Sequence, residues 1–158
     1  MSVSSEQTSL GNSIFVLSGF PFPSSQFTEQ DGKPLIRIRD LLGSKTETNF
    51  TGVFDSAFLI QRNDILIGMD GDFNVVRWQG PEALLNQRVC KVTTTSAELD
   101  MSFLYWWLKP HIQAIHCHTP QTTVRHLSVG DIYKIPKPQL SRNAQAFAAT
   151  VLDTVDEA

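Results

Sequence analysis

Short apolar runs alternate with polar segments over the first 95 residues of the chain. Residues 14–17, 57–60 and 65–67 are three such runs, each flanked by glycine or polar residues. Runs of this length with such flanks are typical of β-strands. The first part of the chain is therefore predicted to be mostly β-structure, with residues 43–56 as a polar loop.

A glycine-containing turn at residues 68–72 separates the apolar run 65–67 from the strand-like segment 73–78. Two such segments joined by a short turn predict a β-hairpin. Residues 88–94 have the composition of a further strand.

Four residues near position 37 alternate strictly. Ile36 and Ile38 share one face, and Arg37 and Arg39 share the other. Because side chains alternate across a strand, the pattern predicts a half-buried strand with two guanidinium groups on its open face. Such a pair suits phosphates or a guanine edge. A plain solvated strand face is the alternative.

The last third of the chain carries helical periodicity. Apolar residues recur every three or four positions over residues 99–115, which predicts a helix that Pro110 should kink or split. Ser128 can cap a short helical turn, and Ser141 can cap a final helix with one apolar face. Short mixed or antiparallel strands with a few helices indicate a single irregular α+β domain.

Composition and charge narrow the class of protein. A chain of 158 residues with 41% hydrophobic residues is long enough to bury one core. The net charge of −3 excludes a uniformly basic nucleic-acid binder, although a local basic patch stays open. No apolar run reaches the roughly 18 residues of a membrane span, and the N-terminus lacks the pattern of a signal peptide. We therefore expect a cytoplasmic protein.

Metal binding and nucleophilic catalysis are weak alternatives. Asp70 and Asp72 lie in the turn, but ordinary turn chemistry explains both. Three histidines lie close to Cys117 in the sequence: His111, His116 and His118. A structural zinc site needs four ligands and would have to recruit Cys90. We therefore expect no metal site and no catalytic residue in this chain.

Seven phrases follow one another along the chain. They are residues 17–27 (LSGFPFPSSQF), 34–41 (PLIRIRDL), 63–71 (NDILIGMDG), 85–89 (LNQRV), 103–105 (FLY), 122–128 (TTVRHLS) and 132–138 (IYKIPKP). In this order they resemble the target recognition domain of type I restriction–modification specificity subunits. The resemblance covers about residues 10–155. The chain departs from the family pattern at Asn63, where the family has glycine, and at Ala144-Gln145, where it has Glu-Gln.

The resemblance implies a domain organisation and a set of partners. Residues 1–13 would be a flexible lead-in, residues 14–140 the recognition domain, and residues 141–158 the start of a conserved spacer helix. The domain would read one half of a split double-stranded DNA sequence, with a second recognition domain or self-association completing the target. Methyltransferase subunits that use S-adenosylmethionine, and through them restriction subunits that use ATP, would supply the chemistry. This chain would hold no cofactor and would not be an enzyme by itself.

The residues expected to contact DNA come from two segments of the predicted β-structure, from the loop that holds Lys45, and from a second polar loop, residues 119–126. They are Arg37, Arg39, Lys45, Asp70, Asp72, Asn74, Arg77, Thr122, Thr123, Arg125 and His126. The cations would meet phosphates or a guanine edge, and Asp70 or Asp72 would accept from cytosine N4. The loop would close the other side of the groove, unless it is a plain surface loop.

Two other functions stay open at this point. The chain can be the recognition domain of a fused restriction–methylation enzyme, although it has no Asn-Pro-Pro-Tyr/Phe motif of an adenine methyltransferase. It can also be a protein-interaction module without DNA binding, in which the last helix and Trp106 matter most. Strong salt dependence of DNA binding would distinguish the recognition domain from the interaction module.

Overall fold

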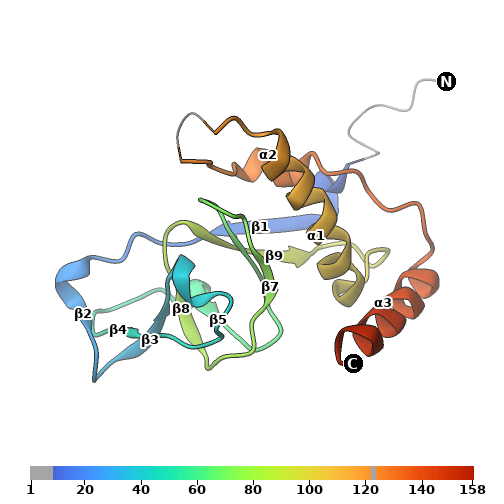
Figure 1. The fold of residues 1–158 in the computed structure, drawn as a ribbon. Helices are drawn as coiled ribbons and strands as arrows, with labels where there is room; N and C mark the ends of the chain where they lie inside the picture. The colour runs from blue at the N-terminus through green and yellow to red at the C-terminus, as the bar shows by residue number, and fades with distance from the viewer. Residues whose placement is uncertain (1–8, 122–123) are drawn as a thin grey trace.

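The computed structural model describes residues 9–121 and 124–158, and within them it has two β-sheets and three α-helices (Figure 1). The first sheet is antiparallel, in the order β1 (Ile14–Ser18), β9 (Val89–Thr94), β6 (Ile65–Gly68) and β7 (Val75–Arg77). The second sheet runs in the order β2 (Phe27–Thr28), β4 (Thr48–Phe50), β3 (Lys33–Ile36), β8 (Ala83–Leu85) and β5 (Leu59–Ile60). It is mixed, because β3 and β8 pair in parallel. The α+β prediction is confirmed.

The central strand β6 is buried on both faces, which explains its continuous apolar run. Ile65 and Ile67 pack into the larger core, beneath the helices. Leu66 points the other way, into a core shared with the second sheet. Trp78 fills that second core and donates its indole N–H to the Pro81 carbonyl at 2.8 Å. Strand β6 therefore links the two sheets, because its side chains pack into the cores on both of its faces.

The helices are α1 (Met101–His118), α2 (Val129–Tyr133) and α3 (Arg142–Asp156). Ser128 and Ser141 cap α2 and α3 as predicted, each accepting from a backbone N–H three residues on. Pro110 was expected to kink or split the helix, and the split is wrong, because α1 continues through it. Leu108 and Ile112 are both buried against the sheet, so packing on either side of the proline holds the helix together.

Three local predictions from the first half of the chain were wrong. The flexible lead-in was expected over residues 1–13, of which 1–8 lie outside the described residues; residues 9–13 are not flexible, because Leu10 is wholly buried and its N–H donates to the Ile135 carbonyl. Residues 43–56 are not all loop, since they contain β4. The strand expected through Arg39 ends at Ile36, and a 3-10 turn over Ile38–Asp40 follows. Arg37 and Arg39 therefore do not share one strand face.

Gln145 docks the last helix onto the domain. Its side chain is buried and accepts from the Asp100 N–H at 2.9 Å. Its amide nitrogen donates to the carbonyls of Glu98 at 3.1 Å and Leu140 at 2.9 Å. Because Asp100 caps α1, this one amide ties the start of α3 to the start of α1. Figure 1 shows α3 lying at the end of the molecule opposite the second sheet.

Candidate functional site

Four segments that are distant in sequence meet at one end of the first sheet, and backbone hydrogen bonds hold them in register. The Met69 N–H donates to the Arg88 carbonyl at 2.8 Å, and the Leu127 N–H donates to the Met69 carbonyl at 2.7 Å. The Gln87 N–H donates to the Phe20 carbonyl at 3.0 Å, which adds the segment after β1. We call this region the sheet-end surface; its side chains are those of Phe20, Asp70, Asp72, Gln87, Arg88, Arg125 and His126.

Asp70 lies at the centre of the sheet-end surface and accepts hydrogen bonds from an arginine and a histidine. One carboxylate oxygen accepts from the Nη1 of Arg88, and the other accepts from the Nδ1 of His126 at 2.7 Å. The Asp70 side chain is 13% exposed, whereas those of Arg88 and His126 are 63% and 62% exposed. Burial alone would raise the pKa of Asp70, but the hydrogen bonds from His126 and Arg88 outweigh it and lower that pKa. A shielded anion thus positions an exposed guanidinium and an exposed imidazole.

Arg88 was not among the expected contact residues. It lies in the LNQRV phrase, between two strands, and its φ of 70° is in the left-handed region that side chains other than glycine rarely adopt. The phrase and the arginine were visible in the sequence. What the sequence could not show was the pairing with Asp70, which is 18 residues away.

Asp72, Arg125 and His116 form a second contact at the edge of the same surface. Arg125 donates to the Nε2 of His116 on α1 at 2.9 Å, and that ring nitrogen lies 4.0 Å from an Asp72 carboxylate oxygen. The ring of His116 also packs edge-on against Phe73. Arg125 therefore ties the loop after α1 to the helix, while Asp72 stays exposed at the hairpin tip.

The basic segment of Arg37, Arg39 and Lys45 flanks the β6–β7 hairpin. Contact is close because Gly68 has no side chain: a Cβ there would lie 3.1 Å from the Ile38 side chain. Arg39 is exposed and pairs loosely with Glu47 at 3.2 Å. The Arg37 N–H donates to the Asp40 carboxylate, so its backbone is fixed while its side chain is half-buried. These cations lie beside the hairpin rather than on a common strand.

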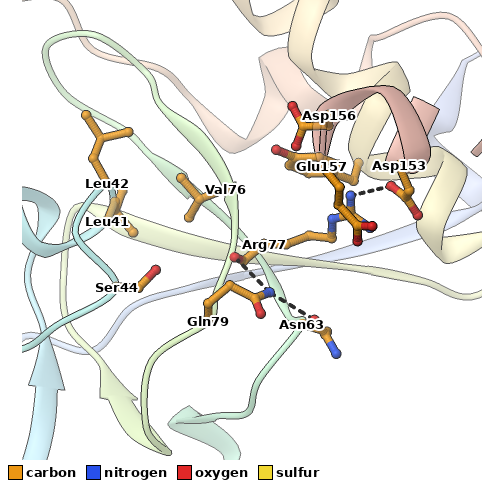
Figure 2. A pocket seen from close by; sticks show the side chains of 11 residues that line it. Leu41, Leu42, Ser44, Asn63, Val76, Arg77, Gln79, Asp153, Asp156 and Glu157 are labelled. Atoms are coloured by element: carbon orange, nitrogen blue, oxygen red, sulfur yellow. Dashed lines mark hydrogen bonds and ion pairs between the residues drawn. The ribbon is translucent and has the colours of Figure 1, made fainter.

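Arg77 lies away from the sheet-end surface, in a contact between β7 and α3. It donates to the Asp153 carboxylate at 2.5 Å, and the indole N–H of Trp106 donates to the same oxygen at 2.8 Å. Its guanidinium carbon lies 4.3 Å from the centre of the Tyr105 ring. Figure 2 shows Arg77 reaching from β7 toward Asp153. Both residues line a cavity of about 400 Å³. With 23% of its side chain exposed, Arg77 is engaged inside the protein and does not join the other expected residues.

The remaining expected residues have simpler surroundings. The Asn74 carbonyl accepts from the Gly68 N–H at 3.0 Å and so closes the hairpin. Thr122 and Thr123 lie outside the described residues. Over residues 9–121 and 124–158, no group of three or more His, Cys, Asp or Glu is arranged to hold a metal ion. Burial raises the pKa of the Cys90 thiol to about 12, so it stays protonated. In the same part of the chain, none of the helices has the length and apolarity needed to cross a bilayer.

Comparison with known proteins finds one family and several similar structures. Residues 6–158 match the family model described as the type I restriction modification DNA specificity domain. The type I restriction enzyme EcoBI specificity subunit of Escherichia coli is 39% identical over 143 residues, which cover 89% of this chain and 30% of that subunit. The chain thus spans less than a third of the length of that relative.

Two solved structures share the fold at lower identity. One is a chain from a structural study of complex assembly and conformational transition of the type I R-M system. It aligns with a TM-score of 0.72 and 15% identity. That alignment covers 95% of this chain and 37% of the other. The type I restriction–modification S subunit from M. genitalium aligns with a TM-score of 0.68 and 20% identity, covering 94% and 38%.

Proposed function

This chain belongs to the family of type I restriction–modification DNA specificity domains, and on that basis we propose that it reads one half of a bipartite double-stranded DNA target. The observation that carries the proposal is the sheet-end surface. There, the side chains of Arg88 and His126 are exposed and are held in position by hydrogen bonds to Asp70. Fixed donors are what reading base edges in a groove requires, because each contact must meet a particular atom.

The basic segment beside the hairpin supplies the complementary, sequence-independent part of the interface. Arg37, Arg39 and Lys45 would contact phosphates and set the register of the domain on the duplex. With a net charge of −3, the chain depends on this local patch rather than on overall charge. We therefore expect weak binding by one domain alone and a large gain when two half-sites are joined.

The partners follow from the same proposal. The chain is a specificity component and not a catalyst, so methyltransferase subunits carrying S-adenosylmethionine would modify the DNA. Restriction subunits carrying ATP would join through them. The second half-site would be read by another recognition domain or by a second copy of this chain. The complex would work in the cytoplasm, where the DNA is.

A pull-down with the methyltransferase subunit encoded beside this chain tests the proposal. The captured complex is incubated with random-sequence duplex DNA and S-adenosylmethionine, and methylated adenines are mapped by sequencing. Methylation within one defined motif supports half-site recognition and identifies the sequence. Capture of the subunit with methylation unrelated to sequence, or a folded chain that captures no subunit, contradicts it.

A protein-interaction module without DNA binding is favoured by one observation. Several apolar side chains of α3 are exposed: Phe147, Val151, Leu152 and Val155. Exposed apolar faces commonly mark contacts with other proteins. The two functions differ in salt response, since DNA affinity falls steeply with ionic strength and apolar contacts do not.

A further inference from the structure

Resting on the proposed function, we propose that Arg88 is a specificity-determining residue that reads a guanine, and that Asp70 is the positioning residue that aims it. The ligand is the O6 and N7 edge of guanine in the major groove, which a guanidinium group contacts with two parallel N–H donors.

The bond to Asp70 leaves the required donors available. Asp70 takes the Nη1 of Arg88, and among the described residues it is the one recorded partner of that side chain. A guanidinium carries five N–H donors in a planar fork. Use of Nη1 leaves the edge formed by Nε and Nη2, whose two donors are parallel and suit the guanine acceptors.

The charge of the cluster favours directional contact over simple attraction to phosphate. Asp70 cancels one positive charge at the surface, and this weakens the counterion-release contribution to affinity. A residue that served phosphate alone would lose affinity through such a neighbour. The same carboxylate removes rotational freedom from the guanidinium, and that restriction benefits a contact that needs a defined angle.

The backbone supports a functional role for this position. Arg88 has a φ of 70°, in a region that costs a non-glycine residue free energy. Gly71, in the hairpin tip beside it, also has a positive φ and is a glycine, as such a backbone favours. The turn that the Val89 N–H closes on the Asn86 carbonyl at 3.4 Å sets this conformation, and it points to use of the Arg88 side chain only together with the Asp70 contact, because Ser44, Asn63 and Phe73 also have a positive φ. The bond from Met69 to the Arg88 carbonyl, at 2.8 Å, holds the strained residue in place.

His126 completes the reading group. Its Nδ1 donates to the second oxygen of Asp70, so Nε2 is left for a neighbouring base. The two Asp70 oxygens therefore fix the spacing between a guanidinium and an imidazole. Replacement of Asp70 should disturb both contacts, whereas replacement of Arg88 should disturb one.

Selection from a randomised duplex library tests the inference with this chain assembled with its methyltransferase subunits, because one domain alone is expected to bind weakly. Wild-type protein, Arg88→Gln, Arg88→Lys and Asp70→Asn are each used at the same concentration, and bound DNA is sequenced. Arg62→Gln is the matched control, because Arg62 is exposed at the opposite end of β6 and hydrogen-bonds only to Gln79 among the described residues. Thermal melts confirm that each variant is folded.

We expect wild-type protein to enrich a motif with one strongly preferred guanine. Arg88→Gln and Arg88→Lys should both lower that preference roughly tenfold, since lysine keeps the charge and loses the fork. Asp70→Asn should lower it less and should also relax a neighbouring position. Arg62→Gln should leave the motif unchanged.

Three results overturn the inference, and they differ in what else they contradict. A wild-type motif that Arg88→Gln and Arg88→Lys both preserve overturns the role of Arg88 but leaves DNA recognition intact. A second result would assign Arg88 to phosphate. In it, Arg88→Gln binds all sequences more weakly, with a salt slope reduced by about one, and Arg88→Lys binds normally. A folded wild-type chain that assembles with the methyltransferase subunits and enriches no motif overturns both the inference and the proposed function.

Discussion

Asp70 and Asp153 make nearly the same contacts and serve different ends. Each carboxylate accepts from an arginine and from one ring N–H, that of His126 in the first case and that of Trp106 in the second. The Asp70 carboxylate is shielded, while the side chains of Arg88 and His126 face solvent. At Asp153 the arginine is covered by the rings of α1. The role of each ion pair therefore depends on which of its partners the surrounding elements bury.

The Asp153 cluster is expected to matter most for stability. Arg77→Ala should lower the free energy of unfolding by about 2 kcal/mol, because it removes a charged hydrogen bond and a cation–π contact with Tyr105. Urea unfolding measures this, with exposed Arg62→Ala as the control. Equal urea midpoints for Arg77→Ala and Arg62→Ala would contradict this expectation. The partly buried pair of Arg77 with Asp153 would then stabilise the fold no more than an exposed arginine does.

The basic segment should show the opposite profile, with an effect on DNA and little on the fold. Arg37→Ala combined with Arg39→Ala should weaken DNA binding by the assembled complex about tenfold and reduce the salt slope by about two. The melting temperature should stay near that of wild type, because the pair of Arg39 with Glu47 is exposed. Unchanged DNA affinity across a salt titration would remove these residues from the interface.

Arg88→Gly sharpens the contrast with Arg77 in a single substitution. Glycine accepts the left-handed φ at position 88, and relief of that strain should offset the lost pair with Asp70. We expect the free energy of unfolding to stay within about 0.5 kcal/mol of wild type, while the preference for the guanine falls roughly tenfold. A loss of stability as large as that of Arg77→Ala would mean that the Asp70 cluster is structural.

The smallest expected effect is on how far the stability of the fold declines at low pH. The hydrogen bond from Arg77 lowers the pKa of Asp153, and those from His126 and Arg88 lower the pKa of Asp70 despite its burial. A carboxyl group whose pKa is lower when folded stabilises the protein above its unfolded value near 3.8. That contribution is lost as the pH falls through the folded value.

Thermal unfolding between pH 6 and pH 3 measures this contribution. Asp153→Asn should flatten the decline by about half a kcal/mol. Asp70→Asn should flatten it by a similar amount if the two clusters are electrostatically alike. A decline identical to that of wild type in both variants would show that neither carboxylate contributes to acid unfolding.

Local signals in the sequence predicted the elements that depend on neighbours in the chain. The hairpin around residues 68–72, the Ser128 and Ser141 caps and the helix over residues 99–115 are confirmed, because turns, caps and helical faces are set within a few residues. The order of seven phrases was enough to predict the family. Asp70 and His126 were identified as candidates from composition and motif.

The tertiary structure decided which carboxylate each arginine contacts. The sequence by itself determined an α+β domain of the type I specificity family and the supply of cations near its hairpin. It did not reveal that Arg77 faces Asp153, 76 residues away, or that Arg88 faces Asp70. An arginine has the same charge in every setting, and local sequence does not encode which distant carboxylate folding brings beside it. Burial by α1 and α3 made one arginine structural, and the open end of the sheet left the other exposed.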